Sequence, residues 1–276
     1  MIKQLVLLVF IMGMFSSCAS RKFKDIQYLE KEDSTNNLSL NIFQPRDKDA
    51  HQLPVVIFVH GGYWTEGNKD IYGFLGRNFA KNDVVTVIPS YTLSPKANYD
   101  TMASEIASAL QWTLNNIENY KGDPDQIYLM GHSAGGHLIA LISTNPKYID
   151  DTSVIKGVIL NDAAGLDMYS YLKENPPTTQ YNYKTTWTTN PEQWKNASPL
   201  YFVDENSPPF MMYVGEKTYP SIKKQNADFV DKLHQFQPNV KPIILNKKHV
   251  PMMSQYFFPW TNRYDEILEF IEETNN

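Results

Sequence analysis

Residues 126–138 read QIYLMGHSAGGHL, and this stretch decides the fold. Its first part, Gln126–Met130, is the apolar run expected of a buried strand, and the apolar residues after Ser133 predict a helix. Between them stands Gly131-His132-Ser133-Ala134-Gly135, where the glycines permit a tight strand-to-helix turn that lifts the serine hydroxyl above a sheet. The simpler alternative is a glycine-rich helix start with Ser133 as its N-cap. We predict that Ser133 is a nucleophile, because it lies where such a turn belongs.

Strand-like and helix-like segments alternate along the rest of the chain. Val84–Ile88 is typical of a strand covered on both faces, and Asn37–Phe43 alternates like a half-buried strand. This order predicts one α/β domain over residues 24–274, built on a doubly wound, mostly parallel sheet. The other predicted strands are 54–59, 154–160, 209–214 and 242–245, and the predicted helices are 99–119, 221–236, 263–273 and one beginning near residue 133.

Two glycines follow the predicted strand at residues 54–59, in the stretch His60-Gly61-Gly62-Tyr63-Trp64. Small residues at a strand exit let the backbone approach a bound carbonyl group, and their N–H groups can receive the negative charge that develops on its oxygen. About seventy residues before a nucleophile turn, such a stretch predicts an oxyanion hole. The residues predicted to form it are Gly61, Gly62, Tyr63 and Ala134.

Taken together, these motifs resemble those of an α/β-hydrolase of the carboxylesterase branch with an HGGxW oxyanion motif. That branch includes arylformamidases, isoprenylcysteine methylesterases and bacterial feruloyl- and acetyl-esterase-like proteins. The resemblance covers roughly residues 53–270 and implies an α/β-hydrolase fold with a short lid insertion. The stretches that match in order and spacing are His60–Trp64, Gly67–Asp70, Ser90–Pro95, Gly122–Ile127 and Gly131–His137.

Three histidines follow Ser133, and the triad order of this fold is serine, acid, histidine. His137 lies one helical turn beyond the serine and is expected to pack, while His234 lies on an amphipathic helix and is expected at the surface. His249 follows the last predicted strand, at the sheet edge where α/β proteins place their sites. The resemblance also puts the general base at His249. His60 precedes the nucleophile, and we expect it to brace the oxyanion loop.

The acid of the triad has two candidates. Relatives usually carry an aspartate three residues after Gly215, and this chain has Thr218 there, which cannot hold an imidazolium by charge. Glu216 is the nearest carboxylate and is our first candidate, although a solvent-facing position is equally compatible with its place in the sequence. Asp162, after the strand at 154–160, is the second candidate, and its simpler role is to cap a loop. Without either carboxylate, a Ser–His dyad would act more slowly.

The segment from Asp167 to Pro208 is rich in Tyr, Thr, Asn, Pro and Trp and lies between two predicted strands. Loops of this length usually act as lids or binding walls, and the alternative is a decorated surface loop. As a lid, the segment would form the acyl or alcohol pocket. The aromatic residues expected to line that pocket are Tyr181, Tyr183, Trp187 and Trp194.

Composition excludes several other classes of protein. With 25 Lys+Arg against 30 Asp+Glu, the net charge is −5, which argues against a nucleic-acid partner. A hydrophobic fraction of 42% excludes a disordered chain. The single cysteine excludes an intrachain disulfide framework and a Cys-clustered metal site. No metal, phosphate-loop or dinucleotide motif is present, so we expect no metal and no cofactor.

The N-terminus reads as an export signal. Residues 1–17 have a basic start, the apolar run Leu5–Phe15 and a small-residue exit, which together predict a signal peptide. The run is too short to span a bilayer, and a buried N-terminal element is the alternative. Phe15-Ser16-Ser17-Cys18 resembles a bacterial lipobox and predicts lipidation of Cys18 as the mature N-terminus. We expect a periplasmic or cell-surface protein anchored to the membrane by this lipid, with Ser20–Asp25 as a tether.

These predictions converge on a serine hydrolase that cleaves small carboxylic esters through an acyl-enzyme. Two other functions stay open from the sequence: an arylformamidase-like amide hydrolase, and a degenerate hydrolase fold that binds a small molecule without cleaving it. Thr218 favours the degenerate fold, whereas the intact motifs around Ser133 and Gly61 oppose it. The partner expected in either catalytic case is a small-molecule substrate.

Overall fold

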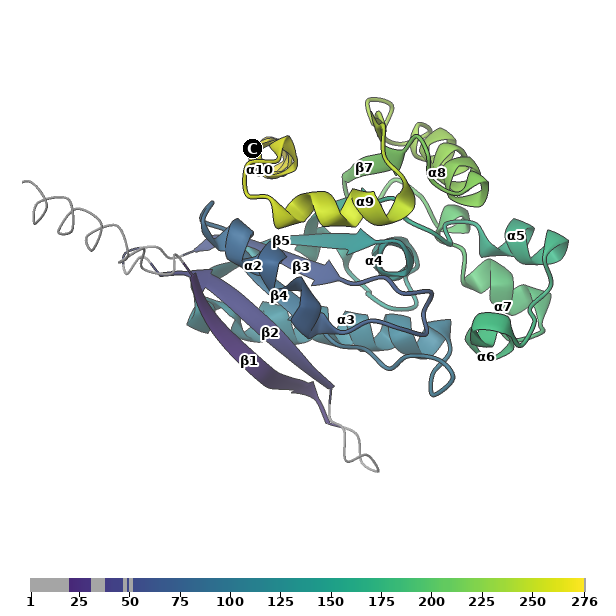
Figure 1. The fold of residues 1–276 in the computed structure, drawn as a ribbon, viewed down its shortest axis with the longest axis horizontal. Helices are drawn as coiled ribbons and strands as arrows, with labels where there is room; N and C mark the ends of the chain where they lie inside the picture. Colours follow the sequence, from purple (N-terminus) through teal and green to yellow (C-terminus); the bar gives the residue numbers. More distant parts are fainter. Residues whose placement is uncertain (1–19, 31–37, 47–48, 50–51, 276) are drawn as a thin grey trace, which may run out of the picture.

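The computed structural model describes residues 20–30, 38–46, 49 and 52–275, so the predicted signal peptide and Cys18 lie outside the described residues. Within these ranges, eight strands form one sheet in the order β1-β2-β4-β3-β5-β6-β7-β8 (Figure 1). The pairs β1–β2 and β2–β4 are antiparallel, and every other neighbouring pair is parallel. The doubly wound, mostly parallel sheet is therefore confirmed. The strands are β1 (Ser20–Leu29), β2 (Leu38–Pro45), β3 (Leu53–Val59), β4 (Val85–Pro89), β5 (Gly122–His132), β6 (Ile155–Asn161), β7 (Phe210–Gly215) and β8 (Ile243–Leu245).

Helices cover both faces of the sheet because the central strands are apolar on both faces. In β3, Val55, Ile57 and Val59 belong to one buried cluster, and Val56 and Phe58 belong to the other. This alternation follows from the two-residue period of a strand, and it gives each face its own core. The first face packs against α3 (Tyr99–Asn116), α4 (Ala134–Thr144) and α8 (Pro220–Leu233); the second packs against α2 (Gly73–Ala80), α9 (His249–Ser254) and α10 (Asn262–Thr274).

The domain begins earlier than we predicted. The stretch expected as a tether, Ser20–Asp25, is the first half of β1, which pairs with β2 at the edge of the sheet. Its charged side chains resemble a linker in the sequence, but charge is also how edge strands avoid pairing with other chains. Phe23 ties this strand to the domain through an edge-on contact with Tyr120, with ring centroids 4.9 Å apart.

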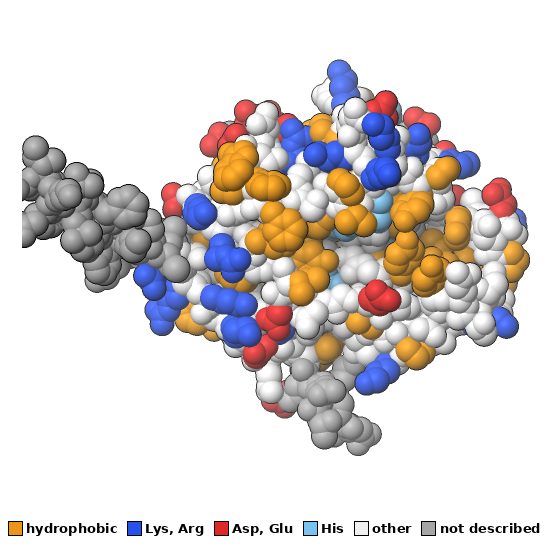
Figure 2. Space-filling view, in the orientation of Figure 1, with side chains coloured by type: hydrophobic (Ala, Val, Ile, Leu, Met, Phe, Trp, Pro, Cys, Tyr) orange, Lys and Arg blue, Asp and Glu red, His pale blue; other side chains and the backbone are white. Residues whose placement is uncertain are grey.

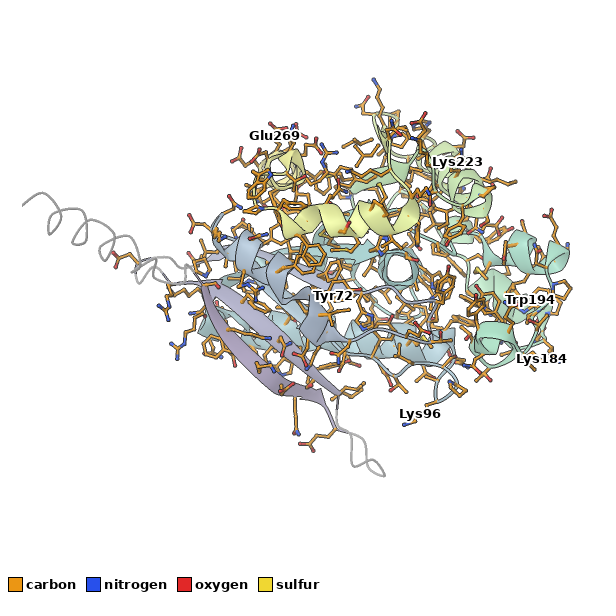
Figure 3. The ribbon with its side chains drawn as sticks, viewed as in Figure 1. Tyr72, Lys96, Lys184, Trp194, Lys223 and Glu269 are labelled. Atoms are coloured by element: carbon orange, nitrogen blue, oxygen red, sulfur yellow. The ribbon has the colours of Figure 1, made fainter. Side chains whose placement is uncertain are left out.

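The segment between β6 and β7 is folded into short helices rather than an open loop. Figure 3 shows Trp194 among them, with Lys184 at their outer edge. Trp187 and Trp194 are buried, at 0% and 7% exposure, so they belong to the core and do not line a pocket as we expected. The elements of this segment are α5 (Met168–Glu174), η4 (Gln180–Asn182), α6 (Tyr183–Trp187), α7 (Pro191–Asn196) and η5 (Pro199–Tyr201).

The carboxyl ends of the parallel strands bring the candidate site residues together. Gly61 follows β3, Ser133 follows β5, Asp162 follows β6, Thr218 follows β7, and His249 follows β8. Parallel strands end at one common edge, which is where open α/β sheets bind their ligands. Among the described helices, none combines the length and apolar character needed to cross a membrane.

Candidate active site

Ser133 stands on the turn between β5 and α4, with φ 55° and ψ −121°. Glycines stand two residues before and two residues after it, because backbones cross there without room for side chains: a Cβ on Gly135 would lie 2.0 Å from the Val59 carbonyl oxygen. The Ser133 carbonyl oxygen accepts the N–H groups of His137 and Ala164, at 3.1 and 3.2 Å. A non-glycine residue persists at such backbone angles only when its surroundings hold it there. The predicted nucleophile turn is therefore present.

His249 connects Ser133 to a carboxylate. Its Nε2 lies 2.9 Å from the Ser133 hydroxyl oxygen, and its Nδ1 lies 2.6 Å from an oxygen of Asp162. With the proton on Nδ1 donated to Asp162, Nε2 is left as the acceptor of the serine proton. This is the arrangement in which a histidine can act as a general base.

Asp162 is fully buried and is held by three donors. It follows β6 in a left-handed conformation, with φ 51°, and its own N–H donates to the Tyr213 carbonyl oxygen at 2.8 Å. One carboxylate oxygen accepts the Gly215 N–H at 2.9 Å, and the other accepts both the Thr218 hydroxyl and the His249 Nδ1–H. These donors compensate for removing the carboxylate from water.

Our first candidate for the acid, Glu216, is not brought to His249. Its side chain is exposed, its N–H donates to the Leu245 carbonyl oxygen, and its carbonyl accepts the Lys223 ammonium. The turn after β7 directs Thr218, not Glu216, toward the histidine. The second candidate, Asp162, occupies the position that an acid requires.

The oxyanion loop lies against Ser133. A Cβ on Gly61 would be 2.9 Å from the Ser133 Cβ, and Gly62 has φ 128°, so neither position accommodates a side chain without strain. Tyr63 follows with φ 52°. Within the described residues, no protein acceptor takes the N–H groups of Gly62, Tyr63 or Ala134. These N–H groups are therefore available to a developing oxyanion.

Three buried histidines support the site. His60 donates through Nδ1 to the Gly61 carbonyl oxygen at 2.8 Å, as expected of a brace for the oxyanion loop. His132 donates through Nε2 to the His249 carbonyl oxygen at 3.2 Å and stacks on the His249 ring at 4.7 Å. His137 accepts the Trp64 indole N–H and donates to the Ala197 carbonyl oxygen, at 3.1 and 2.7 Å. His137 thereby links the oxyanion loop to the segment before β7.

Each of these histidines stays neutral in the fold. Burial lowers the pKa of His60 and His137 to about 4, and burial together with the neighbouring His249 does the same for His132. An unfolded histidine has a pKa of about 6.5. At a pH well above 6.5, these histidines bind no proton in either the folded or the unfolded state, and the free energy of unfolding is not reduced by them. As the pH falls from about 6.5 toward 4, the unfolded state binds more protons and the folded state loses stability.

We therefore expect the free energy of unfolding to fall by about 3 kcal/mol between pH 6.5 and 5.5 if all three histidines contribute, since each contributes about 1 kcal/mol over this range. Urea unfolding across this range measures the slope. His137→Gln should reduce the slope by about one third, because an amide can accept from Trp64 and donate to Ala197 without titrating. An unchanged slope in this variant would contradict the assignment of His137 as neutral.

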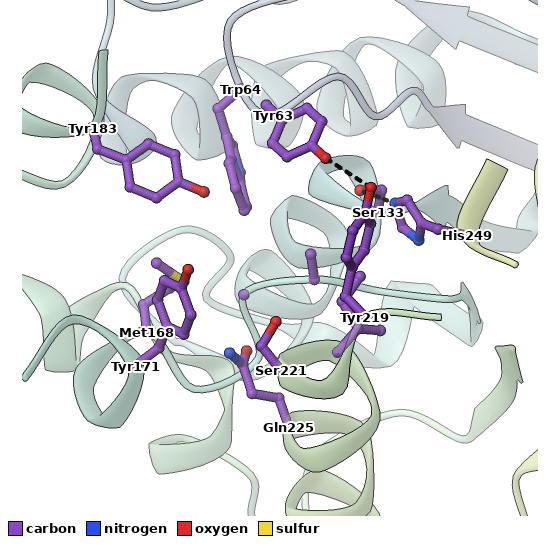
Figure 4. Close-up of a pocket in the computed structure, with 13 residues that line it drawn as sticks. Tyr63, Trp64, Ser133, Met168, Tyr171, Tyr183, Tyr219, Ser221, Gln225 and His249 are labelled. Atoms are coloured by element: carbon purple, nitrogen blue, oxygen red, sulfur yellow. Dashed lines mark hydrogen bonds between the residues drawn. The ribbon is translucent and has the colours of Figure 1, made fainter. Parts of the chain in front are cut away.

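A pocket of about 160 Å³ opens beside Ser133 and His249. Figure 4 shows the side chains of Tyr63 and Tyr219 converging near Ser133, and their hydroxyl groups form a hydrogen bond at 3.3 Å. Tyr183 lines this pocket as predicted, and Tyr181 stacks on Tyr63 with centroids 5.1 Å apart. The segment between β6 and β7 thus supplies part of the pocket wall.

The sequence interpretation missed several residues of this pocket. Tyr219 and Ser221 follow β7 at the same sheet edge as the predicted acid, and Gln225 lies one turn later on α8, so their positions could have been deduced. Met168 and Tyr171 lie on α5, where no sequence pattern marks them. In the described part of the chain, no group of three His, Cys, Asp or Glu side chains is placed to hold a metal ion.

Comparison with known proteins identifies the family. The BD-FAE family model matches residues 40–233. Esterase LipC of Mycobacterium tuberculosis is 27% identical over 208 residues, which cover 70% of this chain and 51% of LipC. Kynurenine formamidase of Danio rerio is 33% identical over 137 residues, which cover 49% of this chain and 44% of that protein. The chain thus spans about half the length of these curated relatives.

Solved structures share the fold. Esterase B of Lactobacillus rhamnosis, inhibited by a tributyrin phosphonate, superposes with a TM-score of 0.76 at 17% identity, covering 99% of this chain and 93% of that one. A truncated carbohydrate esterase from gut microbiota gives a TM-score of 0.75 at 18% identity, covering 94% of this chain and 98% of that one. The α/β-hydrolase fold is confirmed.

Proposed function

Because the chain belongs to the BD-FAE family of esterase-type α/β-hydrolases, we propose that it hydrolyses small carboxylic esters through an acyl-enzyme. One observation carries this proposal: Ser133, His249 and Asp162 form a continuous hydrogen-bonded series, with contacts of 2.9 and 2.6 Å. The series lies beside free backbone N–H groups and a pocket large enough for part of a substrate.

The first half of the reaction forms the acyl-enzyme. The Ser133 hydroxyl oxygen attacks the ester carbonyl carbon while His249 Nε2 takes its proton. The carbonyl oxygen becomes negative and accepts hydrogen bonds from the N–H groups of Gly62, Tyr63 and Ala134. Removing one donor of this kind typically lowers kcat by about 10²–10³-fold. The intermediate collapses, the bond to the alkoxy oxygen breaks, and His249 Nε2 returns the proton to the leaving alcohol.

The second half repeats these steps with water. His249 Nε2 takes a proton from a water molecule as its oxygen attacks the acyl carbon, and the same N–H groups receive the negative charge. The bond to the Ser133 oxygen then breaks, the proton passes to that oxygen, and the carboxylic acid leaves. Asp162 holds the His249 ring in one tautomer and stabilises its charged form throughout.

A fluorophosphonate probe and 4-nitrophenyl acetate test this function. We expect wild-type protein to turn over the ester. The fluorophosphonate should add one phosphonyl group per chain, on the peptide that contains Ser133, and the activity should fall in proportion to this labelling. Heat-denatured protein is the control for nonspecific labelling. Folded protein that neither labels nor turns over any ester would support a binding protein instead, and faster cleavage of a formylamide than of esters would support the amide hydrolase.

We further propose that the chain is an exported lipoprotein. Support comes from the apolar run Leu5–Phe15 and the lipobox-like residues before Cys18, which predict cleavage at the cysteine and a lipid on its thiol. Mass spectrometry of the protein from a bacterial host, beside Cys18→Ser, tests this. A mature N-terminus other than Cys18, or an unmodified Cys18, would overturn it.

A further inference from the structure

Two cavities meet at the catalytic pair, and their chemistry differs. Ser133, His249 and Tyr63 line both. One cavity, the tyrosine pocket, holds about 160 Å³ and lies toward α5 and α8. The other, the apolar groove, holds about 430 Å³ and runs along α9. Because the reacting atoms lie where the cavities join, the two sides of an ester bond face different surroundings.

The tyrosine pocket presents hydrogen-bonding groups that no protein group uses. In the described structure, the hydroxyls of Tyr171, Tyr183 and Ser221 make no hydrogen bond to another protein group, and Figure 4 shows them directed into the pocket. Gln225 lies beside them, and its carbonyl oxygen accepts the Asp167 N–H at 3.1 Å. This bond fixes the amide orientation and leaves the Gln225 NH₂ group for a ligand.

The size of the tyrosine pocket limits its occupant. A cavity of about 150 Å³ is known to hold a benzene molecule, so about 160 Å³ accommodates one six-membered ring. A purely apolar ring would leave several desolvated hydroxyls unpaired, at a cost of about 1–3 kcal/mol for each buried group. The pocket therefore favours a ring that carries hydroxyl groups.

The apolar groove has the opposite character. Ile71, Val250 and Phe257 line it and remain 62%, 69% and 55% exposed. The Phe257 ring packs on Phe74 with centroids 3.9 Å apart, and Met253 completes the wall. Figure 2 shows hydrophobic side chains gathered around the histidine surface in the middle of this face. Exposed apolar surface continuous with a reacting serine is typical of a ligand groove.

We propose that the substrate is an amphiphilic ester: a hydroxyl-bearing ring occupies the tyrosine pocket, and a hydrocarbon chain on the other side of the ester bond occupies the apolar groove. This inference rests on the proposed esterase function and adds the substrate class. The chain is either the acyl or the alcohol part, because Ser133 and His249 line both cavities. In either orientation, only the groove buries a hydrocarbon without isolating polar groups.

Two ester series below their micellar concentrations test the proposal. The first is 6-O-acyl glucose, and the second is the alkyl esters of quinic acid, each with chains of two to eight carbons. We expect kcat/KM to rise with chain length in one series, by up to about fourfold per methylene, since a fully buried CH₂ contributes about 0.8 kcal/mol. The series that shows the rise identifies which part occupies the groove.

Matched variants assign the effect to the two cavities. Phe257→Ser should reduce the ratio of kcat/KM between eight- and two-carbon chains at least tenfold, whereas Phe258→Ser, an exposed neighbour outside the groove, should keep it. Gln225→Leu should lower kcat/KM for the ring-bearing ester relative to 4-nitrophenyl acetate by about tenfold, and Gln235→Leu, in the exposed turn after α8, should not.

The outcomes separate this inference from the function on which it rests. Wild-type protein that cleaves 4-nitrophenyl acetate but shows no rise with chain length in either series overturns the amphiphilic substrate and leaves the esterase function intact. A rise that Phe257→Ser does not reduce also overturns the assignment of the groove. Folded protein that cleaves no ester overturns both proposals.

Discussion

Alanine at Ser133 or at His249 is expected to lower kcat for 4-nitrophenyl acetate by about 10⁶-fold, which is the loss found when a member of a cooperating serine–histidine pair is removed. Ser133 supplies the attacking oxygen, and His249 Nε2, 2.9 Å away, is placed to take its proton. Neither group can act without the other. The double variant should therefore be no slower than either single variant, within about twofold.

Ser143→Ala is the matched control for this prediction. Ser143 is a buried serine ten residues further along the same helical stretch, and its hydroxyl has no hydrogen-bond partner in the described structure. Its replacement should leave kcat within about twofold of the wild type. If Ser133→Ala kept more than about a hundredth of wild-type turnover, a different nucleophile would be required. Additive losses in the double variant would contradict the single catalytic unit.

The sequence could single out Ser133 and His249, whose side chains lie 2.9 Å apart, because strong local signals mark them. The glycines around Ser133 are required by backbone contacts as close as 2.0 Å, and a requirement of that kind is visible in the motif itself. Val55–Val59 alternates between two cores, and such two-sided burial is visible as an unbroken apolar run. His249 follows the last strand, where the order of elements leaves one histidine in position.

The acid could not be chosen from the sequence for a geometric reason. Asp162 and Glu216 follow β6 and β7, which are adjacent parallel strands, and such neighbours lie only about 4.8 Å apart. Two local features determine which of the two carboxylates reaches His249. One is the left-handed backbone of Asp162, with φ 51°, and the other is the turn that directs Thr218 inward. Neither feature has a distinctive sequence signal.

In the segment between β6 and β7, amino-acid composition could not distinguish aromatic residues that line the pocket from those that are buried in the core. Trp64 packs edge-on against Trp187 with centroids 4.7 Å apart, and Tyr99 stacks on the same tryptophan at 5.8 Å. Aromatic side chains serve equally well in a core and in a pocket. Only the tertiary contacts placed Tyr183 at the cavity and Trp187 beneath it.

Asp162→Asn is expected to lower kcat by about 10⁴-fold, the loss observed when the acid of a serine triad is replaced by its amide. The Asn NH₂ group would face His249 Nδ1 and favour the tautomer that carries its proton on Nε2, which cannot accept the serine proton. Glu216→Gln, the matched control at our first candidate, should keep kcat within about twofold because that side chain is exposed. The reverse pattern would make Glu216 the acid after all.

The position of Thr218 suggests how the activity lost in Asp162→Asn could be restored. Its hydroxyl oxygen lies 3.4 Å from His249 Nδ1. The hydroxyl group donates a hydrogen bond to the same Asp162 oxygen that accepts the His249 Nδ1–H. A carboxylate at residue 218 would therefore reach the histidine from the neighbouring strand.

We expect Asp162→Asn/Thr218→Asp to recover at least about 100-fold of the activity lost in Asp162→Asn, as measured by kcat for 4-nitrophenyl acetate. Thr218→Asp alone should slow the enzyme, because two carboxylates would compete for one buried site. No recovery in the double variant would mean that His249 requires the particular approach of Asp162, held by the Gly215 N–H, and that a carboxylate at the end of β7 cannot replace it.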